Sequence, residues 1–91
     1  MHKLPPLNSI RAFEVTGRLR SFSRAADELS VTHGAVSHQI RSLEEWLGVA
    51  LFRRLGKSVE LTDQGRLYLD SVSPALAAIA SASRSISAHE V

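Results

Sequence analysis

The side chains best suited to chemistry in this 91-residue sequence lie in one short segment. It holds His33, Ser37, His38 and Arg41, with Gly34 among them. Imidazole, hydroxyl and guanidinium groups donate or accept hydrogen bonds at the edges of DNA bases, and arginine prefers guanine. Because Gly34 has no side chain, the backbone there can approach another molecule closely. The segment is therefore a candidate surface for reading base pairs.

The alternative for this segment is an ordinary solvated helix face, and two features count against it. Gly34 costs about 1 kcal/mol of helix propensity relative to alanine, which a plain surface helix need not tolerate. The first acidic residues are Glu44 and Glu45, so the first two turns carry no negative charge. Both observations favour base reading.

A second basic cluster, Arg53, Arg54 and Lys57, lies on or beside the tip of a predicted hairpin. Such a hairpin can be an exposed ribbon whose charges protect a sheet edge, or a wing on phosphates or in a narrow minor groove. Since strand residues alternate faces, Arg53 and Arg54 cannot both point the same way. We expect one to face DNA while the other packs or pairs, and we favour Arg53 for the DNA contact.

Catalytic and metal-binding chemistry finds little support. The sequence has no cysteine and no glycine-rich phosphate loop. His33 and His38 are separated by roughly 140° around a helix, which makes a poor metal pair. Glu44 and Glu45 are adjacent and face differently. We therefore expect no enzyme activity, no cofactor and no bound metal.

The distribution of charge agrees with a polyanionic partner. Residues 1–57 hold nine Lys/Arg against five Asp/Glu, whereas residues 58–91 hold two against four. A basic N-terminal part of the chain is suited to binding nucleic acid. No apolar stretch approaches the roughly 20 residues that span a bilayer, and no signal peptide is visible. One small soluble, cytoplasmic domain is expected.

Periodicity and capping residues predict three helices before the hairpin. The helices are expected at about 9–18, 24–29 and 33–47. Their predicted N-caps are Asn8, Ser23 and Thr32, and Gly48 is the expected left-handed cap after the third helix. Val31, the only apolar residue in the break before Thr32, is expected to plug the core from within the turn.

The second half of the chain is expected to hold the hairpin and a long last helix. Strands are predicted at 51–55 and 58–61, joined by Gly56 and Lys57, and must pack on the helices to be stable. Thr62 should cap a helix that runs to about residue 89. Pro74 removes one helical hydrogen bond, so a bend or a break is expected there.

The last helix also carries apolar residues at heptad spacing, which is typical of a helix that dimerises. These residues are Leu69, Val72, Leu76, Ile79 and Ile86. The predicted fold class is therefore mostly α, a winged helix-turn-helix of three helices and a two-stranded wing over residues 1–61. A linker and dimerisation helix follows over 62–91.

Seven blocks of the sequence carry a pattern that can be compared with known families: Leu7–Glu14, Ser21–Leu29, Val31–Ile40, Leu43-Glu44, Leu47–Val49, Leu51–Arg54 and Leu61–Gly65. In this order they resemble the opening of LysR-type transcriptional regulators. The match extends to about residue 88. His33-Gly34 stands where the commoner family pattern has Gln-Pro, a form similar to the branch of glycine-cleavage, β-lactamase and tryptophan-synthesis activators.

The resemblance implies sequence-specific binding to an interrupted palindrome in promoter DNA, as a homodimer held by the last helix. It further implies a larger effector-binding domain that is missing here, response to a small metabolite, higher oligomers of the full-length protein and contact with RNA polymerase. By position, it places base contacts on His33, Gly34, Ser37 and His38, phosphate contacts near Ser23, Thr32 and Arg41, and a wing contact on Arg53.

The main alternative to DNA binding is a winged-helix protein-interaction module whose basic face binds an acidic partner. Salt-dependent binding to promoter DNA would separate the two.

Overall fold

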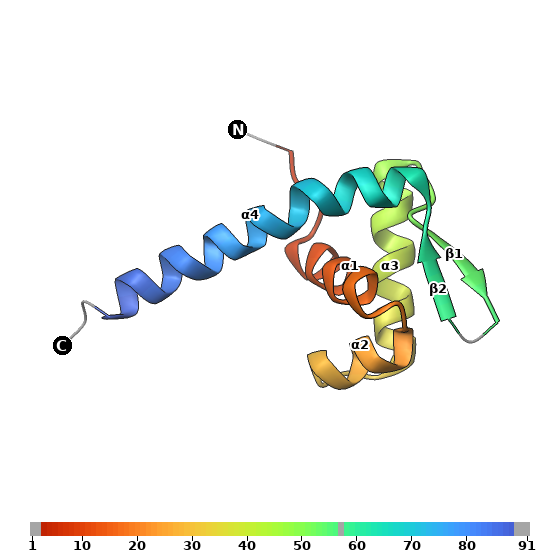
Figure 1. Cartoon of the computed structure of the whole chain (residues 1–91), viewed down its shortest axis with the longest axis horizontal. Helices are drawn as coiled ribbons and strands as arrows, with labels where there is room; N and C mark the ends of the chain where they lie inside the picture. The colour runs from red at the N-terminus through yellow and green to blue at the C-terminus, as the bar shows by residue number, and fades with distance from the viewer. Residues whose placement is uncertain (1–2, 57, 89–91) are drawn as a thin grey trace.

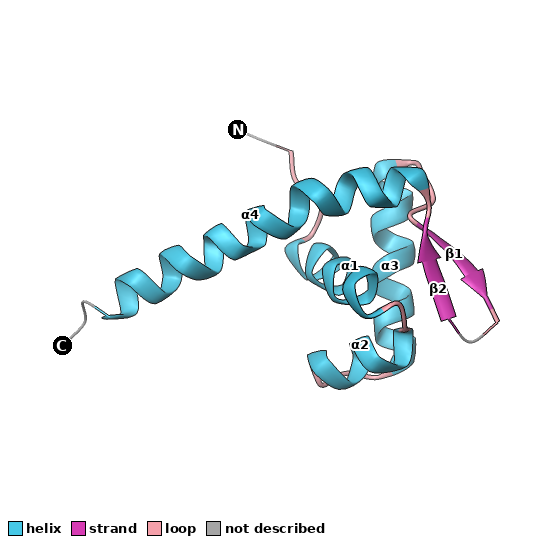
Figure 2. Cartoon of the chain, viewed as in Figure 1, coloured by secondary structure: helices cyan, strands magenta, loops and turns pink. Residues whose placement is uncertain are grey.

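The computed structural model describes residues 3–56 and 58–88, which form four helices and a two-stranded hairpin (Figure 1). The predicted fold class is confirmed, and Figure 2 shows that most of the ribbon is helical. Lys57, expected at the hairpin tip, lies outside the described residues. The elements are α1 Leu7–Leu19, α2 Phe22–Leu29, α3 His33–Leu47, β1 Phe52–Leu55, β2 Ser58–Leu61 and α4 Asp63–Ala88.

The core is built around Phe13 of α1, whose side chain is completely buried. Its ring lies 5.5 Å from that of Phe52 in β1 and 5.3 Å from that of Tyr68 in α4, measured between centroids. Burial raises the pKa of the Tyr68 phenol. Because helix α1 also packs against α2, α3 and α4, the other three helices are assembled around it, and the hairpin joins them through Phe52.

The helix-turn-helix of α2 and α3 is closed by backbone and cap hydrogen bonds. Ser30 adopts a left-handed conformation with φ 57°, and the Val31 N–H donates to the Ala26 carbonyl at 3.0 Å. The Thr32 hydroxyl accepts from the Ala35 N–H at 3.0 Å, which confirms it as the cap of α3. Val31 itself is 47% exposed. The expectation that it plugs the core is wrong, because hydrogen bonds hold the turn instead.

Two predicted helix caps are also wrong. Helix α1 begins at Leu7 after Pro6, with no side-chain cap, so Asn8 lies inside the helix. Helix α2 is capped by Ser21, whose hydroxyl accepts from the Arg24 N–H at 3.1 Å, and not by Ser23. The helix starts earlier than predicted because Phe22 is buried as its first residue.

The hairpin is antiparallel, with Arg53 opposite Glu60 and Arg54 opposite Val59. Gly56 has a φ of 60°, the left-handed conformation that a tight hairpin turn requires. The carboxylate of Glu44 in α3 accepts hydrogen bonds from the backbone N–H groups of Leu51, at 2.7 Å, and Phe52, at 3.3 Å. This carboxylate joins the base of the hairpin to the last turns of α3.

Helix α4 runs without a break through Pro74, and its two halves follow slightly different directions (Figure 1). Thr62 caps it as predicted, accepting from the Gly65 N–H at 3.0 Å while donating to the Ala50 carbonyl at 2.7 Å. The first half packs on α1, and the second projects away from the other elements. No helix within residues 3–56 and 58–88 has the length and apolarity to cross a membrane.

Candidate nucleic-acid interface

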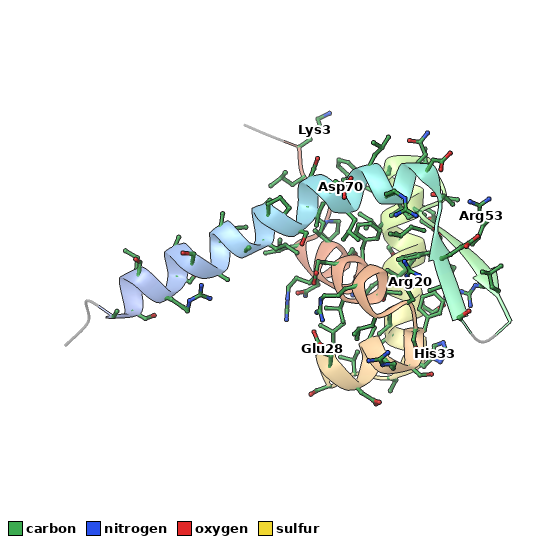
Figure 3. The ribbon with its side chains drawn as sticks, in the orientation of Figure 1. Lys3, Arg20, Glu28, His33, Arg53 and Asp70 are labelled. Carbon is green, nitrogen blue, oxygen red and sulfur yellow. The ribbon has the colours of Figure 1, made fainter. Side chains whose placement is uncertain are left out.

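The N-terminal end of α3 is open to solvent and lies beside the hairpin. His33, Gly34 and His38 are exposed there, as predicted from helical spacing. His33 stacks on Phe22, with 5.5 Å between ring centroids and 29° between ring planes. In Figure 3 its side chain lies at the lower end of the molecule, close to the start of α2. The first turn of α3 thus offers an imidazole and bare backbone on the same surface.

Ser37 lies at a different kind of position from its neighbours. Its side chain was expected on the outer face of the helix, yet the residue is only 9% exposed. Its hydroxyl oxygen accepts hydrogen bonds from Nη1 of Arg41, at 3.0 Å, and from Nη2 of Arg54, at 3.3 Å. Ser37 therefore connects α3, on which it lies together with Arg41, to Arg54 of the wing.

The two neighbouring wing arginines point to opposite faces of the hairpin, as strand alternation predicts. The guanidinium carbon of Arg54 lies 4.7 Å from the centre of the Phe22 ring, on the side that faces the helices. Arg53 forms an ion pair with Glu60 across the hairpin at 3.5 Å. Figure 3 places it on the outer side of the ribbon. Arg54 is the wing arginine that touches the recognition helix.

Two further arginines lie near the start of α2 and were not predicted as part of the site. Arg20 follows α1 with a left-handed φ of 55°, and Arg24 lies in the first turn of α2. Both are exposed, and neither forms an ion pair with a carboxylate of the described residues. Their positions in the sequence, on either side of the aromatic Phe22, are the signal that could have found them.

The remaining predicted phosphate contacts occupy helix starts. Ser23 is exposed in the first turn of α2, and Thr32 is exposed at the N-cap of α3. The N–H groups of a first helical turn have no partner within the helix and favour anions. The Thr32 oxygen is already engaged as a cap acceptor, so the hydroxyl proton remains for a phosphate.

The heptad residues of α4 divide into two groups. Val72 is buried in the chain's own core, and Leu69 packs against that core beside Gly17. Leu76 is half-buried, whereas Ile79 and Ile86 are 53% and 68% exposed. Only the distal part of the predicted seam is therefore open to a partner helix.

No three histidine or acidic side chains within the described ranges come close enough together to hold a metal ion. The titratable group with the clearest perturbation near α2 belongs to an ion pair. Arg18 donates to the carboxylates of Glu14 and Glu28, and its hydrogen bonds lower the pKa of Glu28. This pair ties α1 to α2 and thereby fixes the helix that carries Phe22.

Comparison with known protein families gives one clear match. Residues 7–66 fit the family described as bacterial regulatory helix-turn-helix proteins of the lysR family. The chain is 46% identical over 87 residues to the glycine cleavage system transcriptional activator of Escherichia coli, covering 96% of this chain and 28% of that protein. It is 63% identical over 62 residues to the regulator TrpI of Pseudomonas aeruginosa, covering 68% and 21%.

Solved structures lead to the same family. The BenM DNA-binding domain in complex with benA site 1 DNA superposes with a TM-score of 0.82 at 28% identity, covering 90% of this chain and 95% of that one. An OxyR mutant from Corynebacterium glutamicum gives a TM-score of 0.89 at 26% identity, covering all of this chain and 29% of that one. The chain thus spans about a quarter of the length of the curated relatives.

Proposed function

The chain belongs to the LysR family of bacterial helix-turn-helix regulators, as a DNA-binding domain of that family, and we propose that it binds specific promoter sites as a homodimer. The relatives are transcriptional regulators and not enzymes. One observation carries the proposal. The first turns of α3 expose His33, Gly34 and His38, without an acidic residue, next to a wing whose Arg54 reaches the same helix.

In this proposal the start of α3 enters the major groove, as recognition helices do. His33 and His38 present ring nitrogens to base edges, and the absence of a side chain at Gly34 lets the helix approach closely. Phosphates on either side of the groove are contacted by Ser23, Thr32 and Arg41. Arg20 and Arg24 join this group because they are exposed beside α2 and unpaired with acids among the described residues.

The outer wing arginine, Arg53, is proposed to contact the DNA backbone or the minor groove. Its ion pair with Glu60 is exposed, with 62% of the arginine side chain accessible. Exposed pairs contribute little energy, about 0–1 kcal/mol, so the guanidinium can exchange Glu60 for a phosphate at small cost. Arg53→Ala should weaken binding to every sequence by a similar factor.

The dimer is proposed to form through the distal half of α4. Ile79 and Ile86 lie one heptad apart and are exposed, and Leu76 extends the same stripe. Alanines flank the stripe, which lets a second helix approach closely. Because a dimer presents two reading heads, specificity depends on the spacing of two half-sites, and an interrupted palindrome is the expected target.

Sedimentation of the Ile79→Asp, Ile86→Asp variant tests the dimer, with Ser81→Asp, Ala88→Asp on the opposite face of α4 as the charge-matched control. We expect the first variant to be monomeric and the control to remain dimeric. An unchanged dimer in the first variant would refute this interface.

The whole protein is proposed to carry an effector-binding domain beyond the linker, since the chain spans only 28% of the glycine cleavage activator's length. Residues 1–61 form the proposed reading head and residues 62–91 the linker. Response to a small metabolite, higher oligomers and contact with RNA polymerase belong to that longer protein.

Selection of bound duplexes from a random pool tests the central proposal. We expect one enriched interrupted palindrome, and affinity for it should fall as salt rises, with a slope that reports several phosphate contacts. Absence of enrichment, together with salt-dependent binding to an acidic protein, would favour the protein-interaction alternative.

A further inference from the structure

The contact between wing and recognition helix is organised around a single hydroxyl oxygen. Ser37 Oγ accepts one hydrogen bond from Arg41 and one from Arg54. A hydroxyl has two acceptor lone pairs, so both are occupied. Ser37 keeps only its own proton to donate, which makes it poorly equipped to accept a hydrogen bond from a base.

Arg54 is held from a second direction by an aromatic ring. Its guanidinium lies over the face of Phe22 at 4.7 Å, within the range of a cation–π contact. Phe22 is itself 6% exposed and packs in the core, so the ring is a fixed platform. The long Arg54 side chain, which would otherwise sample many rotamers, is thus held in one orientation. It extends from β1 and is contacted by Phe22 of α2 and Ser37 of α3.

The two guanidinium groups stand close together without an acid between them. Both reach the same oxygen, at 3.0 and 3.3 Å, so their nitrogens are no farther apart than the sum of these distances. Within residues 3–56 and 58–88 the ion pairs involve Arg18 and Arg53, and none involves Arg41 or Arg54. A neutral hydroxyl does not cancel the repulsion between two cations, whereas an anion does.

We propose that Arg41 and Arg54 together bind one backbone phosphate of duplex DNA, with Ser37 and Phe22 as positioning residues that hold the two arginines in place. This inference rests on the proposed function and adds to it a shared phosphate contact that spans helix and wing. A phosphate accepts charge-assisted hydrogen bonds of about 2.8 Å from each side. It can therefore bridge guanidinium groups at the observed separation.

A phosphate is favoured over a base edge by the position of the two arginines on α3. His33, Gly34 and His38 occupy the exposed N-terminal end that is proposed to enter the groove. Ser37 and Arg41 lie on the side that meets the hairpin, as the bond from Arg54 shows. A group bound there is on the wall of the groove and not at its floor, where base edges lie.

The test uses the 91-residue chain and the duplex selected from the random pool. Each phosphate is replaced in turn by a neutral methylphosphonate, and binding is measured by fluorescence anisotropy. On unmodified DNA, Arg41→Gln and Arg54→Gln should each weaken binding about tenfold, for selected and random duplex alike. On the duplex modified at one particular phosphate, neither substitution should weaken binding further. Arg84→Gln, on distal α4, is the charge-matched control and should bind like the wild type.

The salt dependence gives an independent readout. Each neutralised phosphate contributes about 0.9 to the slope of log affinity against log salt. If the two arginines share one phosphate, the Arg41→Gln, Arg54→Gln double variant should lose about 0.9. A loss of about 1.8, or sensitivity of the two variants to different methylphosphonates, would overturn the shared site.

Ser37→Ala tests the positioning role. It should weaken binding to selected and random duplex equally, and this effect should vanish on the same methylphosphonate duplex. A changed sequence preference with an unaltered salt slope would show that Ser37 reads a base, and would overturn its assignment. If the wild-type chain bound no duplex at all, the proposed function would fail before this inference was reached.

Discussion

The two ends of α3 are built on opposite principles. At its C-terminal end a carboxylate and the helix terminus are both satisfied within the chain. Glu44 accepts hydrogen bonds from the backbone N–H groups of Leu51 and Phe52 at the base of the hairpin, and Gly48 ends the helix with a left-handed φ of 76°. At its N-terminal end His33 and Gly34 are exposed, and the arginines nearby have no carboxylate partner among the described residues.

Glycine shows the same difference. A Cβ on Gly65, next to the C-terminal end of α3, would overlap the carbonyl oxygen of Leu51. A Cβ on Gly34 would meet only the Thr32 hydroxyl, at 4.0 Å. The first glycine is required by packing inside the chain. The folded chain leaves room for a side chain at the second glycine. We therefore attribute the glycine at position 34 to the close approach of a partner molecule.

The largest expected effect is a loss of stability on substitution of Gly65, next to the C-terminal end of α3. Gly65→Ala should lower the free energy of unfolding by about 3 kcal/mol, because backbone and not a flexible side chain blocks the methyl group. Urea denaturation followed by circular dichroism measures this loss. Stability equal to the wild type would show that α4 can shift away from Leu51, and would weaken the contrast between the two ends.

The next effect concerns the carboxylate that joins α3 to the hairpin. Glu44→Gln should destabilise the domain by about 1.5 kcal/mol, because hydrogen bonds to a charged acceptor are stronger than those to a neutral one. Glu45→Gln, at the neighbouring exposed position, is the control and should change stability little. Equal effects of the two substitutions would mean that Glu44 acts only through net charge.

At the N-terminal end of α3, one substitution should change stability and DNA affinity in opposite directions. Gly34→Ala should stabilise the domain by up to about 1 kcal/mol, since alanine has the higher helix propensity and the site has room for the methyl group. The same substitution should weaken binding to the selected duplex, by crowding the groove. Denaturation and anisotropy on one preparation measure both. Unchanged affinity would remove the close-approach role of Gly34.

The smallest expected effect on stability concerns the ion pair between Arg18 of α1 and Glu28 of α2, which lies away from both ends of α3. The hydrogen bond from Arg18 lowers the pKa of Glu28 below its usual 4.5. A lowered carboxyl pKa contributes stability above the unfolded value, and that contribution is lost as pH falls through the folded value. Glu28→Gln should therefore melt slightly earlier than the wild type at neutral pH, and the difference should vanish well below pH 4.5.

Asp27→Asn is the control for this measurement, because Asp27 is the adjacent exposed acid and has no ion pair within the described ranges. A difference between Glu28→Gln and the wild type that persists at low pH would mean that charge is not its source.

Much of the site followed from local pattern. Thr32, Thr62 and Gly48 act within one turn of their own positions, so residue type and spacing sufficed to predict them. The exposure of His33 and His38 followed from helical periodicity. The errors lie where burial in the core or the backbone hydrogen bonds of a turn outweigh the preference of a single residue. Ser21 replaced Ser23 as a cap because Phe22 is drawn into the core, and Val31 stayed exposed because backbone hydrogen bonds closed its turn.

The division of α4 shows the same limit. Heptad spacing marks an apolar stripe but does not say what covers it. The stripe continues from Val72, which the core buries, to Ile86, which is left in solvent. Which residues serve the fold and which remain for a partner depends on how far α1 extends beneath the helix. Periodicity along one helix contains no information about that.

The sequence alone determined the order of elements, the hairpin turn, both ends of α3, the start of α4 and the basic character of the reading end, because each depends on neighbours within a few residues. Tertiary structure decided how that end is assembled. Arg54 comes to lie over Phe22 only when the hairpin packs on the helices. The same packing lets Arg54 donate a hydrogen bond to Ser37, although the two residues are 17 positions apart in the chain. Alternation along a strand separates Arg53 from Arg54, but the packing of three elements selects which one meets the recognition helix.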